Sequence, residues 1–189
     1  MIVRWTIATA GVLALSAVAV NFYMPWRSQD APMPSATVGH GETAALACPV
    51  DAKPAPLDFT MKDVSGRDVT LAQFKGKVIL LDFWATWCGP CKVEIPGFVA
   101  FQNRYSQNGL QVVGISVDDT ADLLQPYVKD LKMNYPVLLG LGHDDVQDAF
   151  GPLVGIPTTF LISRDGKICA KHAGFADKET FEREIRALL

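Results

Sequence analysis

Beyond residue 53, the pattern of hydrophobic and polar positions predicts strands that alternate with helices. Residues 77–84 and 110–117 are nearly continuous apolar runs, which is typical of strands buried on both faces. Residues 57–71 alternate around a polar turn, and this pattern predicts a small β-hairpin. The other predicted elements are helices at about 90–105, 120–131, 144–150 and 177–189, and strands at about 136–139, 158–162 and 167–171.

This order of elements predicts an α/β fold, with a mixed central sheet, helices on both faces and an N-terminal β-hairpin. The last two strands flank a polar turn at residues 164–166, and Asp177 is placed to open the terminal helix. Asp119 or Thr120 can cap the helix that follows them. Pro96 lies inside the first long helix and is expected to kink it.

Residues 1–27 are predicted to be a membrane anchor or a signal segment. No residue between Arg4 and Arg27 is charged, and the run is long enough for a helix across a bilayer, which needs about 20 residues. Small residues at 17–19 leave a cleaved signal peptide as the alternative, but apolar residues continue beyond them and favour an uncleaved anchor. Either interpretation places the remaining chain on the exported, periplasmic side of the inner (cytoplasmic) membrane.

Residues 28–53 are rich in Pro, Ala, Ser and Gly, and they predict an extended spacer before one domain at residues 54–189. The chain has 17 basic and 20 acidic side chains, a net charge of −3. This balance offers no basic field for nucleic acid, which is excluded as a partner. His40, His143 and His172 are scattered without ligand spacing, so no metal site is predicted.

The candidate chemistry lies where a buried strand gives way to a helix, at Cys88 and Cys91 with Gly-Pro between them. Cysteines three apart in a first helical turn can bring their sulfurs within bonding distance, and the helix N-terminus stabilises a thiolate. Cys88, nearer to solvent, is the expected nucleophile, and Cys91 is the expected resolving thiol. A structural disulfide and half of a zinc site are the alternatives; a zinc site needs a second nearby pair, and Cys48 and Cys169 are far apart in the sequence.

These motifs resemble a known family. Residues 82–92, Asp-Phe-Trp-Ala-Thr-Trp-Cys-Gly-Pro-Cys-Lys, resemble the active-site stretch of thioredoxins, and residues 155–158, Gly-Ile-Pro-Thr, resemble their cis-proline loop. The continuation to residue 96, the N-terminal anchor, the hairpin and the extra helix and strand at about 120–139 resemble the membrane-anchored TlpA/ResA group. The resemblance implies a thioredoxin-like fold with a central helix–strand insertion. It also implies dithiol–disulfide exchange with protein partners, with no cofactor besides the redox-active disulfide.

The resemblance also implies roles for single residues. Pro157 is expected to be cis and to face the two cysteines, with Ile156 offering backbone groups to an extended substrate strand. Asp82 is the lone acid in an apolar strand, so it is predicted to be buried with a raised pKa. As the family's buried acid, it would exchange a proton with Cys91. Glu94 either tunes thiol protonation, as the matching glutamate does in ResA-like proteins, or is a solvated helix residue.

Trp87 is expected beside the reactive cysteine, where it would shape a docking surface; a core aromatic would look the same in the sequence. Cys169 falls between two lysines on the polar face of its strand, which is an odd place for a free cysteine. A Cys48–Cys169 disulfide that pins the spacer to the sheet is therefore predicted, with unpaired or intermolecular thiols as the alternative.

The leading functional hypothesis is a membrane-tethered protein-disulfide reductase. Electrons would enter from an upstream membrane or soluble dithiol donor and leave to disulfides of exported proteins. The resemblance suggests cytochrome c maturation or assembly of oxidase copper sites as contexts, and the Gly-Pro dipeptide resembles that of reducing thioredoxins. Three competing hypotheses remain: a dithiol oxidase or isomerase, a Cu(I) chaperone, and a thiol peroxidase, although Thr86 stands two rather than three residues before Cys88.

Overall fold

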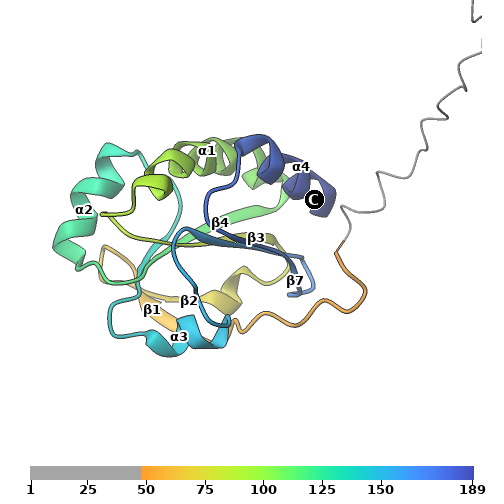
Figure 1. Cartoon of the computed structure of the whole chain (residues 1–189), viewed down its shortest axis with the longest axis horizontal. Helices are drawn as coiled ribbons and strands as arrows, with labels where there is room; N and C mark the ends of the chain where they lie inside the picture. Colours follow the sequence, from red (N-terminus) through yellow and green to blue (C-terminus); the bar gives the residue numbers. More distant parts are fainter. Residues whose placement is uncertain (1–47) are drawn as a thin grey trace, which may run out of the picture. The chain divides into compact units, whose positions relative to one another are not determined.

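The computed structural model describes residues 48–189 (Figure 1). The predicted anchor at residues 1–27, the spacer up to residue 47 and His40 lie outside the described residues. Among the helices that residues 48–189 form, none is both long and apolar enough to cross a membrane.

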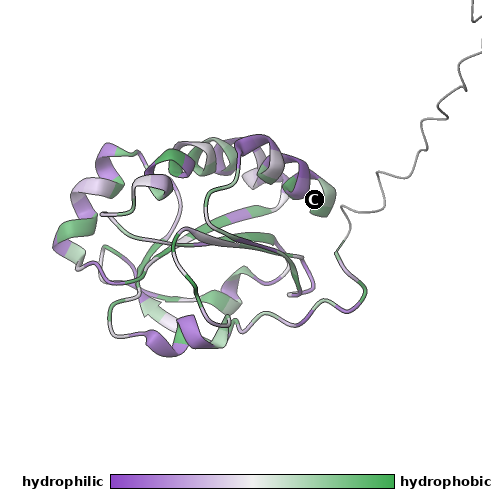
Figure 2. Cartoon of the chain, viewed as in Figure 1, coloured by the Kyte–Doolittle hydropathy of each residue, from purple (hydrophilic) through white to green (hydrophobic). Residues whose placement is uncertain are grey.

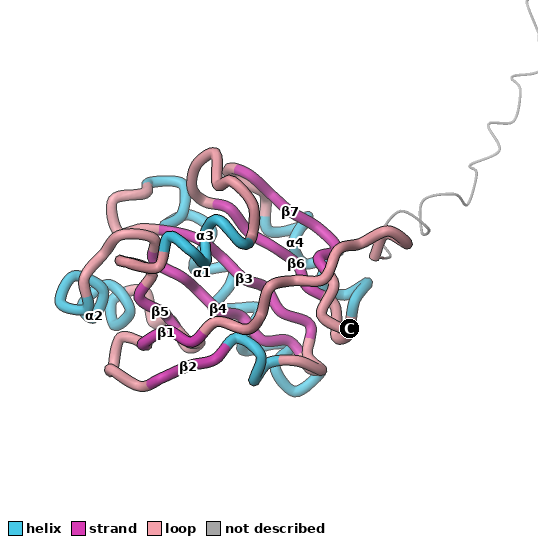
Figure 3. Tube along the Cα trace, turned by 90° about the horizontal axis from the view of Figure 1, so that it is seen from below, coloured by secondary structure: helices cyan, strands magenta, loops and turns pink. Residues whose placement is uncertain are grey.

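The core of the described part is a five-stranded sheet formed by β3 (Val78–Trp84), β4 (Leu110–Ser116), β5 (Val137–Leu139), β6 (Thr158–Ile162) and β7 (Ile168–Ala173). The strands lie in the order β5-β4-β3-β6-β7, with β3 parallel to β4 and antiparallel to β6 (Figure 3). Every residue of β3 and β4 is buried, because both faces of the sheet are covered, as the continuous apolar runs predict. The predicted mixed α/β sheet is confirmed.

Each face of the sheet carries its own apolar layer. On one face lie α1 (Gly89–Tyr105) and α4 (Lys178–Leu188), whose Phe98 and Phe181 rings meet edge to face at 5.2 Å. On the other face lie α3 (Asp144–Ala149) and the N-terminal hairpin. Figure 2 shows hydrophilic and hydrophobic residues interspersed along the helices. Helix α1 continues through Pro96.

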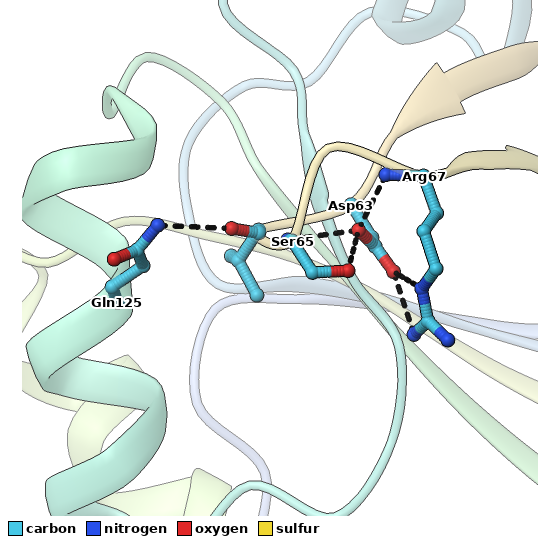
Figure 4. A network of polar contacts seen from close by, with 5 residues as sticks. Asp63, Ser65, Arg67 and Gln125 are labelled. Atoms are coloured by element: carbon cyan, nitrogen blue, oxygen red, sulfur yellow. Dashed lines mark hydrogen bonds and ion pairs between the residues drawn. The ribbon is translucent and has the colours of Figure 1, made fainter.

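The predicted hairpin consists of β1 (Thr60–Lys62) and β2 (Asp68–Thr70), followed by the short helix η2 (Leu71–Phe74). Asp63 holds its turn: Oδ1 accepts hydrogen bonds from the backbone N and hydroxyl of Ser65, and Oδ2 accepts one from Arg67 (Figure 4). Burial raises the pKa of Asp63, but these hydrogen bonds outweigh it and lower the pKa to about 2. Gln125 donates to the Val64 carbonyl oxygen, which joins the hairpin to helix α2 (Ala121–Asp130).

The predicted central insertion consists of α2 (Ala121–Asp130), which follows β4 after a short loop, and the edge strand β5. The predicted capping of α2 is wrong in its mechanism. Thr120 occupies the N-cap position, but its side chain makes no capping hydrogen bond. Asp119 is buried instead and accepts hydrogen bonds from Thr86, 33 residues earlier in the chain. A tertiary partner therefore outcompetes the helix end for this carboxylate.

The segment before the hairpin is tied to the edge strand β7. Cys48 and Cys169 form a disulfide across 121 residues of sequence, which is the predicted pairing. The backbone N of Ile168 donates to the Lys53 carbonyl oxygen. Within residues 48–189, contacts with the sheet therefore begin upstream of the predicted domain start at residue 54.

Candidate active site

The Cys-Gly-Pro-Cys motif lies where β3 ends and α1 begins. Cys88 is the N-cap residue of α1, and its Sγ accepts a hydrogen bond from the backbone N of Cys91 at 3.2 Å. The two cysteines form a disulfide, with their Cα atoms 5.4 Å apart. Pro90 stands in the first turn, where a missing N–H removes no helical hydrogen bond. The start of the helix thus holds the two sulfurs together.

The N-terminus of α1 favours negative charge at Cys88. Unpaired N–H groups and aligned peptide dipoles put partial positive charge there, which stabilises a thiolate. Cys88 is 4% exposed and Cys91 is fully buried. Cys88 is therefore the outer thiol, as predicted, although it is less accessible than its position suggested. A partner disulfide must dock closely around it to react.

The Ile156–Pro157 peptide bond is cis. The antiparallel register of β3 and β6 pairs Phe83 with Thr158, so Pro157 lies level with Trp84, at the end of the sheet from which α1 starts. Ile156 packs against the apolar cluster that contains both cysteines. The strand register thus brings the cis-proline loop and the Cys-Gly-Pro-Cys motif, which are far apart in the sequence, to the same end of the sheet.

Asp82 is buried in β3 on the side of the sheet that α1 covers. Leu80 and Trp84, two residues away in either direction, belong to the apolar cluster on that side, and alternate residues of a strand share a face. The Oγ1 of Thr159 donates a hydrogen bond to Asp82 Oδ1 at 3.1 Å. Burial and the nearby charge of Glu94 raise the pKa of Asp82 to about 8, against the opposing effect of that hydrogen bond. The prediction that Asp82 is buried with a raised pKa is confirmed.

Glu94 is a second buried acid on this side of the sheet. It is 5% exposed, and its Oε1 accepts a hydrogen bond from the backbone N of Ala176 at 2.8 Å. Burial raises the pKa of Glu94 to about 7, while the Ala176 hydrogen bond and the charge of His172 act to lower it. The alternative of a solvated helix residue is wrong, because the segment between β7 and α4 covers this position. Both carboxyl groups therefore titrate near neutral pH.

Two neighbouring aspartates hold the loop that carries the motif. Asp119 accepts hydrogen bonds from the backbone N of Thr86 at 2.7 Å, from its Oγ1 at 2.6 Å and from Ser116 Oγ at 2.6 Å. Asp118 accepts one from Trp87 Nε1 at 3.0 Å. Trp87 is 64% exposed, so a core role for this ring is wrong. In the sequence, the position of Asp118 and Asp119 directly after an apolar strand was the only sign that they would hold this loop.

A groove of about 420 Å³ opens beside Glu94, between α1 and the start of α4. Val93 and Phe175 line it and are both exposed. An apolar hollow therefore adjoins a carboxyl group that titrates near neutral pH.

The copper-chaperone hypothesis needs only the two cysteines and stays open, whereas the peroxidase hypothesis depends on the surroundings of Thr86. Within residues 48–189, no three His, Cys, Asp or Glu side chains gather as metal ligands would. His143 begins α3, while His172 contacts Glu184. The Thr86 hydroxyl donates to Asp119, so it is not free to donate to a peroxide at the reactive sulfur.

The arrangement is suited to thiol–disulfide exchange, because an outer thiol at a helix N-terminus can attack and a buried thiol can resolve the mixed disulfide. Fold and site together define a thioredoxin-like thiol–disulfide oxidoreductase. A model of the AhpC/TSA family matches residues 52–171. The thiol-disulfide oxidoreductase ResA of Bacillus thuringiensis subsp. konkukian is 32% identical over 136 residues, which cover 72% of this chain and 77% of ResA. The chain belongs to the AhpC/TSA family and is a thiol–disulfide oxidoreductase of the ResA and TlpA type.

Two further relatives agree with this placement. The ResA of Geobacillus thermodenitrificans is 30% identical over 132 residues, 69% of this chain and 74% of that protein. The crystal structure of a Chlorobium tepidum protein described as a thiol:disulfide interchange protein, DsbE, superposes with a TM-score of 0.67 at 34% identity. The superposition covers 73% of this chain and 97% of that one, so the shared fold spans nearly the whole of the solved domain.

Proposed function

We propose that this chain reduces disulfides in exported proteins through Cys88 and Cys91 while an N-terminal helix tethers it to the membrane. The observation that carries the proposal is the cysteine pair at the N-terminus of α1, on the same side of the sheet as the buried Asp82. A helix N-terminus makes the outer sulfur a nucleophile, and a buried acid near the inner sulfur can take its proton.

The proposed reaction has two exchange steps. The Cys88 thiolate attacks one sulfur of the substrate disulfide, a mixed disulfide forms, and the other substrate sulfur leaves as a thiolate. Cys91 then gives its proton to the carboxylate of Asp82 and attacks the Cys88 sulfur. The bond between Cys88 and the substrate breaks, and the second substrate sulfur leaves as a thiolate. Two electrons pass to the substrate, and the enzyme ends with the Cys88–Cys91 disulfide.

The residues around the pair would assist these steps. Glu94 would tune thiol protonation through its effect on the pKa of Asp82. The exposed Trp87 would contact the docked partner. Ile156 and the cis Pro157 would receive an extended segment of the substrate, since they lie at the end of the sheet from which α1 starts.

The proposed setting is the periplasmic face of the inner membrane. Residues 1–27 would supply the anchor, and an upstream membrane or soluble dithiol donor would reduce Cys88–Cys91 after each turnover. Apocytochromes awaiting haem and copper-delivery proteins of oxidases are the proposed substrate contexts. The chemistry proposed needs no cofactor besides the disulfide.

The reduction potential of the Cys88–Cys91 pair tests the proposal. The full chain would be equilibrated in glutathione or dithiothreitol buffers, and alkylation with mass mapping would follow this pair separately from Cys48–Cys169. A potential near or below roughly −270 mV supports a reductase, and one nearer roughly −120 mV would show a dithiol oxidase. Consumption of peroxide would contradict the proposal in favour of a thiol peroxidase. Stoichiometric Cu(I) binding without disulfide exchange would contradict it in favour of a copper chaperone.

A further inference from the structure

A row of polar side chains runs across the sheet from Asp82 toward the edge strand. The strand register pairs Asp82 with Thr159 of β6, and Thr159 with His172 of β7. Residues paired in register on neighbouring strands project to the same face of a sheet. The imidazole of His172 indeed packs on that face, with its ring 5.0 Å from the ring of Phe181 in α4.

The outer end of the row is a hydrogen-bonded pair within reach of solvent. His172 Nε2 lies 2.7 Å from Glu184 Oε2, and each of the two side chains is 20% exposed. Asp82 and Glu94 are both buried. Access to water therefore increases from the buried acids to the imidazole and Glu184.

Glu94 is coupled by charge both to Asp82 and to His172. Its Oε1 is held by the backbone N of Ala176, in the segment between β7 and α4, and its buried Oε2 has no hydrogen-bond partner within residues 48–189. An unpaired buried carboxyl oxygen is a place where a proton can reside. His172 acts to lower the pKa of Glu94, and Glu94 raises the pKa of Asp82, so the groups interact in sequence.

The other charged groups on this face are engaged elsewhere. Lys178 of α4 lies over an aromatic ring of α1. Glu182, two residues before Glu184, accepts a hydrogen bond from Arg104 of α1. Among the described side chains of α1 and α4, Glu184 is therefore the acid that pairs with His172.

We propose that His172 and Glu184 form the solvent-facing end of a proton route that begins at Asp82 and Glu94. The inference rests on the proposed dithiol chemistry, in which Cys91 must lose a proton each time it attacks the mixed disulfide. That proton passes from the Cys91 thiol to the carboxylate pair and leaves for water by way of the His172 imidazole. Glu184 orients that imidazole through the hydrogen bond between the two side chains. His172 and Glu184 are positioning residues, because they act through the acids and touch no sulfur.

The test uses the reduced full chain and oxidised glutathione as the disulfide, with exchange rates measured from about pH 5 to pH 9. The titration of Glu94 is followed in the same proteins by carboxyl-carbon NMR. His172→Gln is expected to move the Glu94 midpoint to higher pH and to slow exchange near neutral pH, because the outer acceptor of the route is lost. Glu184→Gln keeps a hydrogen-bonding group beside the imidazole and is expected to slow exchange in the same direction; it also serves if His172→Gln does not fold.

Two matched variants control for structural effects. Glu182→Gln changes an acid on the same helix that binds Arg104, and His143→Gln changes a histidine at the start of α3. Both are expected to keep the wild-type profile. The inference is overturned if His172→Gln leaves the profile unchanged, or if it moves the Glu94 midpoint without moving the rate. A wild-type chain that does not exchange at all would overturn the proposed function and the inference with it, whereas an active wild type with an unaffected variant overturns the inference alone.

Discussion

Replacing Asp82 with asparagine is expected to stabilise the folded protein, and the gain should grow with pH. The ordinary pKa of this carboxyl is 3.8, and in the fold burial and Glu94 raise the pKa to about 8. Between these values the folded state keeps a proton that the unfolded state releases, so the wild-type free energy of unfolding falls as pH rises. Asparagine keeps an oxygen for the Thr159 hydrogen bond but carries no charge, so it removes this effect.

The magnitude follows from the pKa difference. One unit corresponds to about 1.4 kcal/mol, so a shift from 3.8 to about 8 corresponds to roughly 6 kcal/mol when it is fully expressed. The stabilisation by Asp82→Asn should therefore be near zero at about pH 4, and it should approach that figure above about pH 8. Exchange activity should fall at the same time, because the proton acceptor for Cys91 is lost.

Urea unfolding of the oxidised full chain at several pH values measures this difference directly. Asp58→Asn is the matched control, because Asp58 is an exposed aspartate whose charge remains in water when the protein folds. The control is expected to show no pH-dependent gain. A stability difference between wild type and Asp82→Asn that stays constant with pH, or that favours the wild type as pH rises, would refute the reasoning.

Three other substitutions probe the bridge, the motif loop and the coupled acids. Replacing Cys48 and Cys169 with alanine is expected to lower the free energy of unfolding by up to about 5 kcal/mol, because the bridge closes a loop across 121 residues; an unchanged urea midpoint would contradict this. Asp119→Ala leaves three hydrogen-bond donors without their acceptor and should lower the free energy of unfolding by about 2–4 kcal/mol. Asp118→Ala removes one exposed hydrogen bond and should lower it by less than about 1 kcal/mol. Equal losses in urea unfolding would count against a structural role for Asp119 in the motif loop. Glu94→Gln removes a charge that raises the pKa of the buried aspartate in β3, so the rate profile of thiol exchange should move to lower pH, and a move to higher pH would be inconsistent with the coupling.

Strands and their burial could be predicted from the sequence where one local pattern decided the outcome. The run at residues 78–84 is apolar apart from Asp82, so both the central strand and the burial of its acid follow from a few consecutive residues. Asp177 likewise caps α4 through the backbone N of Thr180, a contact within one helical turn.

The surroundings of a side chain could not be predicted where a segment distant in the sequence packs against it. Glu94 is buried because Ala176, 82 residues later, covers it, and no local periodicity records that contact. Asp119 is drawn away from the end of α2 by Thr86 for the same reason. His172 lies in a strand, and the sequence around it does not indicate an acidic partner. Its partner Glu184 reaches it because α4 folds back over β7.

The Cys48–Cys169 bridge also has a mechanical consequence. A pull applied at residue 48 passes through a covalent bond into β7, and it does not have to be borne by the hydrogen bonds at the sheet edge. Residues 49–168, which include the reactive pair, form a closed loop that such a force cannot lengthen beyond the span of the bridge. Tension between residue 48 and the C-terminus would load only β7 and α4. The two reactive cysteines thus lie outside the part of the chain that carries strain applied where a tether would be joined.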